Sequence, residues 1–443
     1  HSMSSAVADH YHSVIVGAGP AGTGPLVYGA WSGRLGTLLD RGLAVVESGS
    51  SLGPGRLERY AINSNSTGST FLECLEHGVS GQYLQSTMNS PLKVDVDKYR
   101  DSVLPLSLAS GLLRSIGDDL LASTTHSPNS HAFLETRAEG IRVLSPGRFE
   151  VSLASPEGAR RITADRVLLA TGGEPQVARG AGAMLAECIR RNGGRELPMM
   201  VSSEELLTET GRAGAEAWLD GYDSPHVIVL GGAHSALSSL WLLLERMSGD
   251  FGFAEGSLTL LHRSPIKVFY ESVEEARSDG FTHFRESDVG TKGQVFPIGG
   301  LRGDAKALYR RISGLDNSVR EKRVKLAPLP ATCAGWDALG VDWKSLALVV
   351  FATGYVQPDL PIRNASGTRI ALHGHFTERY VDQEARMLDA FGAPIPGLFA
   401  TGFTSGFSPV QMLGGEPSYV GKENSVWLCQ HLLGEMLFNA LTN

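Results

Sequence analysis

The sequence predicts an α/β protein with two units of parallel sheet and a small antiparallel β meander attached to the first. Three observations lead to this prediction. Two glycine-rich motifs, Gly17–Gly22 and Gly231–Ala236, each follow a β-branched run and precede an apolar helix. The chain has 443 residues, about three times the ~150 of a typical domain. Its 53 glycines are about 12% of the chain, against ~7% on average, so many turns must bring the backbone close to another group.

The composition excludes several classes of protein. With 42% hydrophobic and 19% charged residues, the chain can bury a core and is not intrinsically disordered. The 39 Lys and Arg residues against 47 Asp and Glu give a net charge of −8 without a separate basic block, so nucleic acid and anionic membranes are not expected partners. No apolar run approaches the ~18 residues needed to cross a bilayer.

The cysteines and the N-terminus indicate the setting of the protein. Cys74, Cys188, Cys333 and Cys429 occur singly, without a CxxC pair or a zinc-like His spacing, so we expect a reduced, cytoplasmic environment and no metal site. The start His1-Ser2-Met3 is typical of a cleaved tag, and no signal peptide is expected.

The first glycine motif predicts a dinucleotide site. The strand run Ser13–Val16 is followed by Gly17-Ala18-Gly19-Pro20-Ala21-Gly22 and a helix. In this pattern Gly17 permits the tight turn, Gly19 leaves room for a pyrophosphate, and Gly22 lets the helix pack closely on the strand. The N-terminus of the helix, at Pro20 and Ala21, then faces the phosphates.

An acidic residue follows at the end of the next strand. Leu43–Val46 leads into Glu47 and Ser48, and the Glu47 carboxylate is placed to accept hydrogen bonds from ribose hydroxyls. From Gly22 to Glu47 is 25 residues, somewhat more than the usual ~20, so we interpret Ser32–Gly42 as an extended helix end or a loop insertion. A glycine-rich turn without a ligand is the alternative, which the order of strand, glycines, helix, strand and acid disfavours.

The second glycine motif predicts a site that prefers NADPH to NADH. After the strand His226–Leu230 come Gly231, Gly232, Ala233, His234, Ser235 and Ala236, and the next strand, Ser257–Leu261, ends in His262 and Arg263 instead of an acid. An arginine can form a charge-assisted bond with a 2′-phosphate, which an acid would repel. His234 is either a turn residue near the phosphates or a hydrogen-bonded core histidine.

Three related strings place small residues after predicted strands. They are Ala170-Thr171-Gly172, Ala352-Thr353-Gly354-Tyr355 and Ala400-Thr401-Gly402. We expect the first two to lie on connections between domains, beside a bound dinucleotide, and the third precedes a Gly-rich loop and the C-terminal helix. The polar loop Gly53–Phe71 is expected either to line the ring system of a cofactor, a flavin ring if the family resemblance given below holds, or to be a solvated loop. Its polar candidates are Arg56, Asn63 and Asn65, and Gln411, Met412 and Leu413 complete the expected cofactor contacts.

With these motifs the chain resembles the class B flavin monooxygenases, and most closely their N-hydroxylating branch, the lysine and ornithine hydroxylases. Gly17–Pro20 is similar to the FAD motif of that family, Gly231–Ala236 to its NADPH motif and Ala352–Tyr355 to its ATGY motif, in the same order. Val201-Ser202-Ser203 resembles its linker serines. The resemblance implies two Rossmann-like domains, with FAD bound by residues 1–195 and 340–443 and NADPH by an inserted domain, 196–339.

The chain also departs from the family pattern. Ala21-Gly22 replaces the usual bulky residue followed by Asn or Ser, and the FxGxxxHxxx(Y/W) fingerprint of ketone-oxygenating relatives is absent between the glycine motifs. The stretch Pro265–Arg311 matches the substrate pocket of the lysine and ornithine enzymes only loosely, which leaves the substrate open. The stretch Ala138–Val167, with a turn at Ser155–Gly158, alternates apolar and polar residues and predicts the antiparallel meander.

The resemblance implies a reaction. NADPH would reduce FAD, and the reduced flavin would take up dioxygen to form a C4a-hydroperoxyflavin that oxygenates a nucleophilic heteroatom, most simply an amine nitrogen in a biosynthetic pathway. No catalytic acid or base is indicated. Three alternatives remain: an NADPH-dependent FAD oxidoreductase of the disulfide type, an amine oxidase or dehydrogenase without oxygen insertion, and a non-enzymatic flavoprotein. A homo-oligomer is compatible with the sequence.

Overall fold

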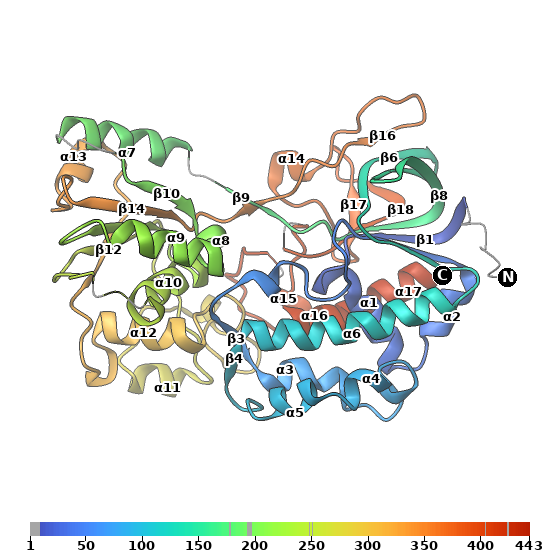
Figure 1. The fold of residues 1–443 in the computed structure, drawn as a ribbon, viewed down its shortest axis with the longest axis horizontal. Coiled ribbons are helices and arrows are strands. Elements are labelled where there is room, and N and C mark those ends of the chain that lie inside the picture. The colour runs from blue at the N-terminus through green and yellow to red at the C-terminus, as the bar shows by residue number, and fades with distance from the viewer. Residues whose placement is uncertain are drawn as a thin grey trace.

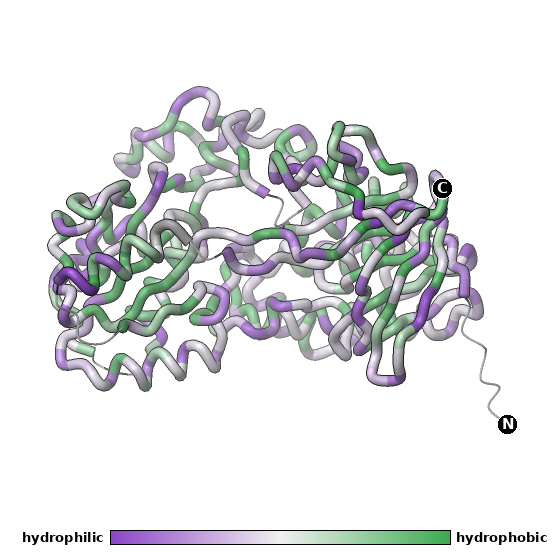
Figure 2. The backbone as a smooth tube through the Cα atoms, turned by 90° about the horizontal axis from the view of Figure 1, so that it is seen from above, coloured by the Kyte–Doolittle hydropathy of each residue, from purple (hydrophilic) through white to green (hydrophobic). Residues whose placement is uncertain are grey.

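A computed structural model describes residues 9–176, 179–192, 197–247, 249, 251–403, 405–422 and 425–443. These residues form two units side by side (Figure 1). The first unit comprises residues 9–173 and 357–443, and the second comprises the described residues from 179 to 353. Hydrophobic segments gather inside each unit (Figure 2), so each has its own core. No helix in the described part of the chain is long and apolar enough to cross a membrane.

The first unit is built on a nine-stranded sheet. Its parallel part has the order β5-β2-β1-β8-β18, and β17 pairs antiparallel with β18. The strand β8 is long enough to serve two partners: its first half pairs antiparallel with β7, and its second half runs parallel to β1. The strands β6, β7 and β8 form the predicted antiparallel meander, which is confirmed. The strands are β1 (His10–Val16), β2 (Leu43–Val46), β5 (His131–Phe133), β6 (Arg137–Ser145), β7 (Arg148–Ser155), β8 (Gly158–Leu169), β16 (Ile362–Arg363), β17 (Arg386–Leu388) and β18 (Pro394–Ala400).

Helices cover this sheet because their apolar faces pack on its buried strands. The main ones are α1 (Pro20–Trp31), α2 (Leu35–Arg41), α6 (Leu106–His126), α16 (Val426–Gln430) and α17 (Leu432–Thr442). Between Ser32 and Gly42 lies a separate short helix, α2, rather than an extended helix end or a loop. The smaller elements are η1 (Gly55–Arg59), β3 (Asn63–Thr67), α3 (Gly68–Leu72), η2 (Glu73–Leu75), η3 (Ser80–Gln82), α4 (Gln85–Met88), α5 (Pro91–Asp97), β4 (Val103–Pro105), α14 (Gly374–Thr377) and α15 (Val410–Leu413).

The second unit is a doubly covered parallel sheet with the order β10-β14-β11-β12-β13. Alternate residues of β11 face opposite cores: Val227 and Val229 lie in one, and Ile228 and Leu230 in the other. The near-continuous apolar strands follow from burial on both faces. The strands are β10 (Met199–Ser202), β11 (His226–Leu230), β12 (Leu258–His262), β13 (Val324–Pro328) and β14 (Leu346–Phe351), and the helices are α7 (Arg179–Arg191), α8 (Ser203–Leu206), α9 (Glu209–Leu219), α10 (His234–Trp241), η4 (Leu242–Arg246), α11 (Val273–Ser278), η5 (Glu286–Asp288), α12 (Gly303–Ser313), η6 (Leu315–Asn317) and α13 (Cys333–Asp337).

The boundaries of the second unit differ from the predicted 196 and 339. The strand β14 lies in the middle of the second sheet, and α7 contributes Leu185, Cys188 and Ile189 to the second unit's core. The chain instead crosses between the units at a two-stranded ribbon, in which β9 (Glu174–Pro175) pairs antiparallel with β15 (Tyr355–Val356). The reason is that β14 is buried on both faces and must therefore lie inside a sheet, and the sequence motif that follows it does not determine which sheet that is.

Candidate cofactor and substrate site

The first glycine turn lies between β1 and α1. Gly17 has φ +90°, and a Cβ there would lie 2.3 Å from the carbonyl oxygen of Ala170. A Cβ on Gly22 would lie 1.8 Å from the oxygen of Gly17. The fold itself therefore requires glycine at these two positions.

Gly19 is different. Its φ of −69° suits any residue, and the nearest atom that a Cβ would meet is the Cα of Gly55, at 3.5 Å. Within the described residues, nothing in the protein requires glycine here, so the open space at the N-terminus of α1 fits a ligand that approaches the backbone.

Glu47 lies beside the same turn, at the end of β2. Its carboxylate accepts hydrogen bonds from the backbone N–H of Ala18 and of Gly49, both at 2.7 Å, and from the Ser48 hydroxyl at 3.2 Å. The 25-residue spacing does not displace Glu47, because α2 takes up the extra residues on the far side of the strand.

Two further strand ends of the first sheet reach this region. Gly172 follows β8 with φ +72° and open space where a Cβ would be, and Gly402 follows β18 with φ +92°, its Cβ position 3.1 Å from Ala21. The buried Thr401 hydroxyl has no hydrogen-bond partner among the described residues. Because buried hydroxyls are normally paired, this one fits a missing ligand group. Thr171 lies between Ala170 and Gly172, at the same strand end.

The second glycine turn repeats this geometry between β11 and α10. Gly231 has φ +143°, and its Cβ would lie 2.4 Å from the oxygen of Ala352. In each unit the first glycine thus abuts the alanine of an Ala-Thr-Gly string, Ala170 in the first and Ala352 in the second. Gly232 packs against His262, and Ser235 lies in the first turn of α10.

Arg263 follows β12 directly and is exposed. In the described part of the chain its guanidinium makes no recorded hydrogen bond or ion pair, so it is available to an anion near the second glycine turn.

His234 is a hydrogen-bonded, largely desolvated histidine at the start of α10. Its Nε2 accepts the backbone N–H of Arg302 at 3.0 Å. Burial, together with the charge of Arg302, lowers the pKa of His234 to about 4. The ring is therefore neutral near pH 7 and hydrogen-bonded within the second unit, and its role near the phosphates stays a prediction.

The ATGY string lies at the ribbon between the units. The Thr353 hydroxyl donates to the carbonyl of Gln176, and the Gln176 N–H donates to the carbonyl of Gly354 at 2.8 Å. Lys422 donates to the carbonyl of Tyr355 at 2.9 Å. Burial, with the nearby Tyr60 and Glu204, raises the pKa of the Tyr355 hydroxyl, which is therefore protonated. The expected connection between domains is confirmed.

Two polar residues of the loop 53–71 join the units. Arg56 donates to the carbonyl of Gly173 at 2.6 Å and pairs with Glu204 of α8 at 2.9 Å. Asn63 donates to Asp304 of α12 at 2.8 Å. Both side chains have partners across the junction. This role differs from the two that were expected, lining a cofactor ring and forming a solvated loop. Asn65 and Gln411 are exposed, and Met412 and Leu413 pack partly against the first core.

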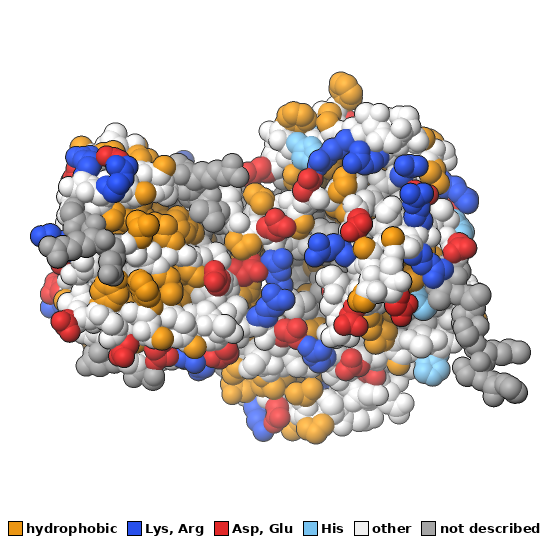
Figure 3. All heavy atoms as spheres, turned by 45° about the horizontal axis from the view of Figure 1, so that its top comes forward, with side chains coloured by type: hydrophobic (Ala, Val, Ile, Leu, Met, Phe, Trp, Pro, Cys, Tyr) orange, Lys and Arg blue, Asp and Glu red, His pale blue; other side chains and the backbone are white. Residues whose placement is uncertain are grey.

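A cavity of about 310 Å³ opens at this junction. Charged side chains of both signs gather where the two units meet (Figure 3). One oxygen of Glu204 is buried there without a hydrogen-bond partner among the described residues. The cavity is lined by Arg56, Arg59, Tyr60, Pro175, Ser202, Glu204, Glu205 and Thr208. A larger one, about 560 Å³, lies on the first unit and is lined by Leu169, Gln357–Leu360, Ile362, Arg369–Leu372, His375 and Tyr380.

Sequence reasoning missed a buried polar network in the stretch 265–311. Asp279 accepts hydrogen bonds from the Tyr270 hydroxyl at 2.6 Å and from Arg310 Nε at 2.9 Å. Arg302 lies over the ring of Phe269, with 3.4 Å from its Cζ to the ring centroid. Glu416, fully buried, accepts the N–H groups of Ile298 and Gly299. The sequence carried no signal for these pairs beyond their residue types.

The two glycine turns and the strand ends beside them define a class: a protein with two dinucleotide-binding units joined by a short ribbon. No family model matches the chain. A CMP-5′-(3-aminopropyl)phosphonate hydroxylase of Streptomyces rubellomurinus is 32% identical over 440 residues, which are 98% of this chain and 97% of the relative. The chain therefore belongs to the N-hydroxylating branch of the class B flavin monooxygenases.

Solved structures share the fold at low identity. An L-lysine 6-monooxygenase of Pseudomonas syringae is 16% identical with a TM-score of 0.55, over 98% of this chain and 99% of that one. An FAD-bound cadaverine monooxygenase of Erwinia amylovora is 13% identical with a TM-score of 0.57, over 97% and 94%. An ornithine N-hydroxylase of Kutzneria sp. 744, solved with reduced FAD, NADP⁺ and L-ornithine, is 14% identical with a TM-score of 0.53, over 97% and 99%. The predicted two-domain α/β fold is confirmed.

Proposed function

We propose that this enzyme N-hydroxylates the primary amine of an aminoalkylphosphonate carried on a nucleotide. The observation that carries the proposal is the 32% identity, over nearly the whole of both chains, to the hydroxylase whose name states such a substrate. The loose match of residues 265–311 to the lysine and ornithine enzymes supports a substrate other than a free amino acid.

The proposal assigns the two glycine turns. FAD would lie on Gly17, Gly19, Pro20, Ala21 and Gly22, with Glu47 toward its ribose and Thr401 and Gly402 beside it. NADPH would lie on the turn Gly231–Ser235 with its 2′-phosphate at Arg263. When bound, these cofactors supply the hydride and activate the dioxygen.

The junction cavity supports an anionic substrate. Arg59 lines it and, among the described residues, has no recorded ion-pair partner, so its guanidinium is free to bind a phosphate or phosphonate. The unpartnered oxygen of Glu204 in the same cavity can accept a hydrogen bond from the amine or take its proton. Residues of both units line this space and would displace water from around a bound substrate.

The proposal extends to the setting of the enzyme. We expect a cytoplasmic setting, and among the described residues no disulfide joins the four cysteines. Its partners would be the small amine and dioxygen, without nucleic acid, and its subunits could associate as a homo-oligomer.

The experiment is a substrate panel with ¹⁸O₂, analysed by mass spectrometry. The panel contains the CMP-linked 3-aminopropylphosphonate, the free aminoalkylphosphonate, lysine and ornithine. We expect one labelled oxygen on the nitrogen of the nucleotide-linked amine, and at most weak turnover of the other three. Preferred turnover of lysine or ornithine would contradict the substrate, and oxidation without incorporation of label would contradict N-hydroxylation.

A further inference from the structure

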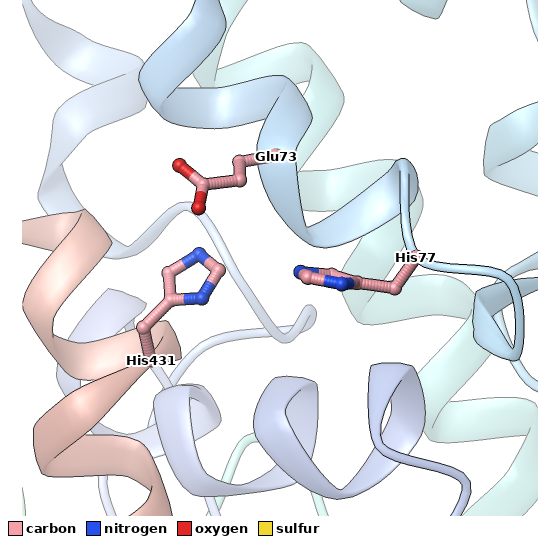
Figure 4. A group of neighbouring side chains, drawn as sticks. All are labelled: Glu73, His77 and His431. Atoms are coloured by element: carbon pink, nitrogen blue, oxygen red, sulfur yellow. The ribbon is translucent and has the colours of Figure 1, made fainter.

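Three metal-ligand side chains converge on the first unit, away from both glycine turns. Glu73 lies in η2, His77 in the turn that follows it, and His431 between α16 and α17. Each offers one ligand atom, and these atoms all lie within 4.8 Å of one another. Figure 4 shows the three side chains pointing toward a common space from two segments far apart in the sequence.

Both imidazoles present a buried nitrogen that lacks a partner. His431 is only 6% exposed, and its Nε2 has no hydrogen-bond partner among the described residues. The Nε2 of His77 is buried and unpartnered in the same way. Since buried polar atoms are normally satisfied, two such nitrogens beside one carboxylate indicate a missing ligand.

Neighbouring aromatic residues hold the three groups in position. The Trp427 Nε1–H donates to one oxygen of Glu73 at 2.7 Å, which leaves the other oxygen for an ion. Trp31 stacks on His77 at 4.1 Å between ring centroids, and Trp427 stacks on His431 at 4.7 Å. Such second-layer contacts are typical of metal sites.

We propose that Glu73, His77 and His431 bind one Zn²⁺ ion. Two imidazole nitrogens and one carboxylate oxygen form a ligand set that zinc accepts, and its tetrahedral geometry leaves one position for water. The site lies beside Trp31, the last residue of the 12-residue helix α1, whose first turn carries the glycine motif. At ~1.5 Å per residue the two are about 18 Å apart, so the ion cross-links η2 to the C-terminal helices and does not reach the cofactors.

The test uses the FAD-loaded enzyme, freed of metal by a chelator and dialysed, with Zn²⁺ alone as the titrant in calorimetry. We expect one equivalent of zinc per chain. His431→Ala, His77→Ala and Glu73→Gln should each weaken binding by at least ~10-fold, and Gln at position 73 keeps an acceptor for Trp427. His126→Ala is the matched control, since it removes an exposed histidine at the end of α6 and should bind zinc as the wild type does.

Thermal denaturation gives a second measurement. Zinc should raise the Tm of the wild type and of the control but not of the three ligand variants, because a ligand that binds only the folded state stabilises it. The rate of NADPH oxidation should not change on loading. Failure of the wild type to bind zinc, equal binding by the ligand variants, or a zinc-dependent oxidation rate would each overturn the proposal. If His431→Ala does not fold, the partly exposed His77 carries the test.

Discussion

At the scale of the residue, the glycines separate into those that the fold requires and one that it does not. A Cβ on Gly17 or Gly22 would collide with backbone oxygen, at 2.3 and 1.8 Å. A Cβ on Gly19 would meet nothing closer than 3.5 Å. The fold therefore requires glycine at positions 17 and 22. Glycine at position 19 is explained by a ligand that approaches the backbone.

Gly19→Ala should therefore fold and lose FAD. The added methyl fills the space that a pyrophosphate would occupy, so the flavin content of the purified protein should fall while its circular dichroism stays that of the wild type. Gly22→Ala is the comparison, and it should reduce soluble yield. Full flavin occupancy in Gly19→Ala would contradict the assigned site.

Arg263→Ala should change the choice of coenzyme. Loss of a charge-assisted bond worth ~1.5–3 kcal/mol should raise the KM for NADPH roughly 10- to 100-fold and leave that for NADH nearly unchanged. Steady-state kinetics with both coenzymes would measure this. Equal losses with the two coenzymes, or none, would show that another residue binds the 2′-phosphate.

His234 should make folding stability depend on pH. Its pKa is about 4 in the folded protein against an ordinary value of 6.5. Between these values the unfolded chain takes up a proton that the folded protein does not, so stability falls as the pH drops through this window. Between pH 7 and 5 the loss is roughly 2 kcal/mol. Urea unfolding at both pH values should show a smaller loss in His234→Gln, and an identical loss would exclude His234 as the cause.

At the scale of the element, short segments of the first unit reach the second: the helix η1, the strand β3 and the loop after α15. Arg56 reaches α8, Asn63 reaches α12, and the loop after α15 brings Glu416 to the turn at Ile298 and Gly299. The Glu416 contacts link the segment that follows the ATGY string to the stretch 265–311. The two units are therefore joined by these polar contacts and by Ala61, which is buried in the core of the second unit.

Glu416→Ala should loosen this junction. It leaves two partly buried N–H groups without an acceptor, at ~1–3 kcal/mol each, so thermal denaturation should show a loss of about 2–6 kcal/mol, toward the lower end because water can reach them. Glu416→Gln retains one acceptor oxygen and should lose less. Equal stability of Glu416→Ala and the wild type would show that water replaces the carboxylate.

At the scale of the whole molecule, each unit supplies one glycine turn, and the β9–β15 ribbon joins them. A protonated amine has no lone pair, so the substrate nitrogen must be neutral when it reacts. Hydride transfer from NADPH to a flavin involves no atom of the amine. Oxidation of NADPH can therefore be uncoupled from oxygenation of the substrate.

The ratio of hydroxylated product to NADPH consumed should rise with pH until the bound amine is deprotonated, while hydrogen peroxide falls in parallel. Quantifying product, NADPH and peroxide in the same reactions from neutral to alkaline pH would test this. A ratio that does not change with pH would mean that the enzyme removes the proton at every pH tested, with Glu204 the first residue to replace.

What the sequence alone determined is local. The glycine turns, the strands before them, Glu47 and Arg263 at strand ends and the meander follow from short-range rules of backbone geometry and periodicity, and the fold confirms these elements. The cofactor roles of the residues stay predictions. The three Ala-Thr-Gly strings were informative because each ends a buried strand.

The tertiary structure alone decided which distant residues meet. It placed β14 in the second sheet and brought the N–H of Arg302 within hydrogen-bond distance of His234. It also brought Glu73 and His77 next to His431, which lies more than 350 positions away in the sequence. The spacing of these residues in the sequence indicated no metal site. A pattern within a few residues reports helix and strand geometry, because those depend on neighbours along the chain. Contacts between segments depend on how complete elements pack, and no local pattern encodes that.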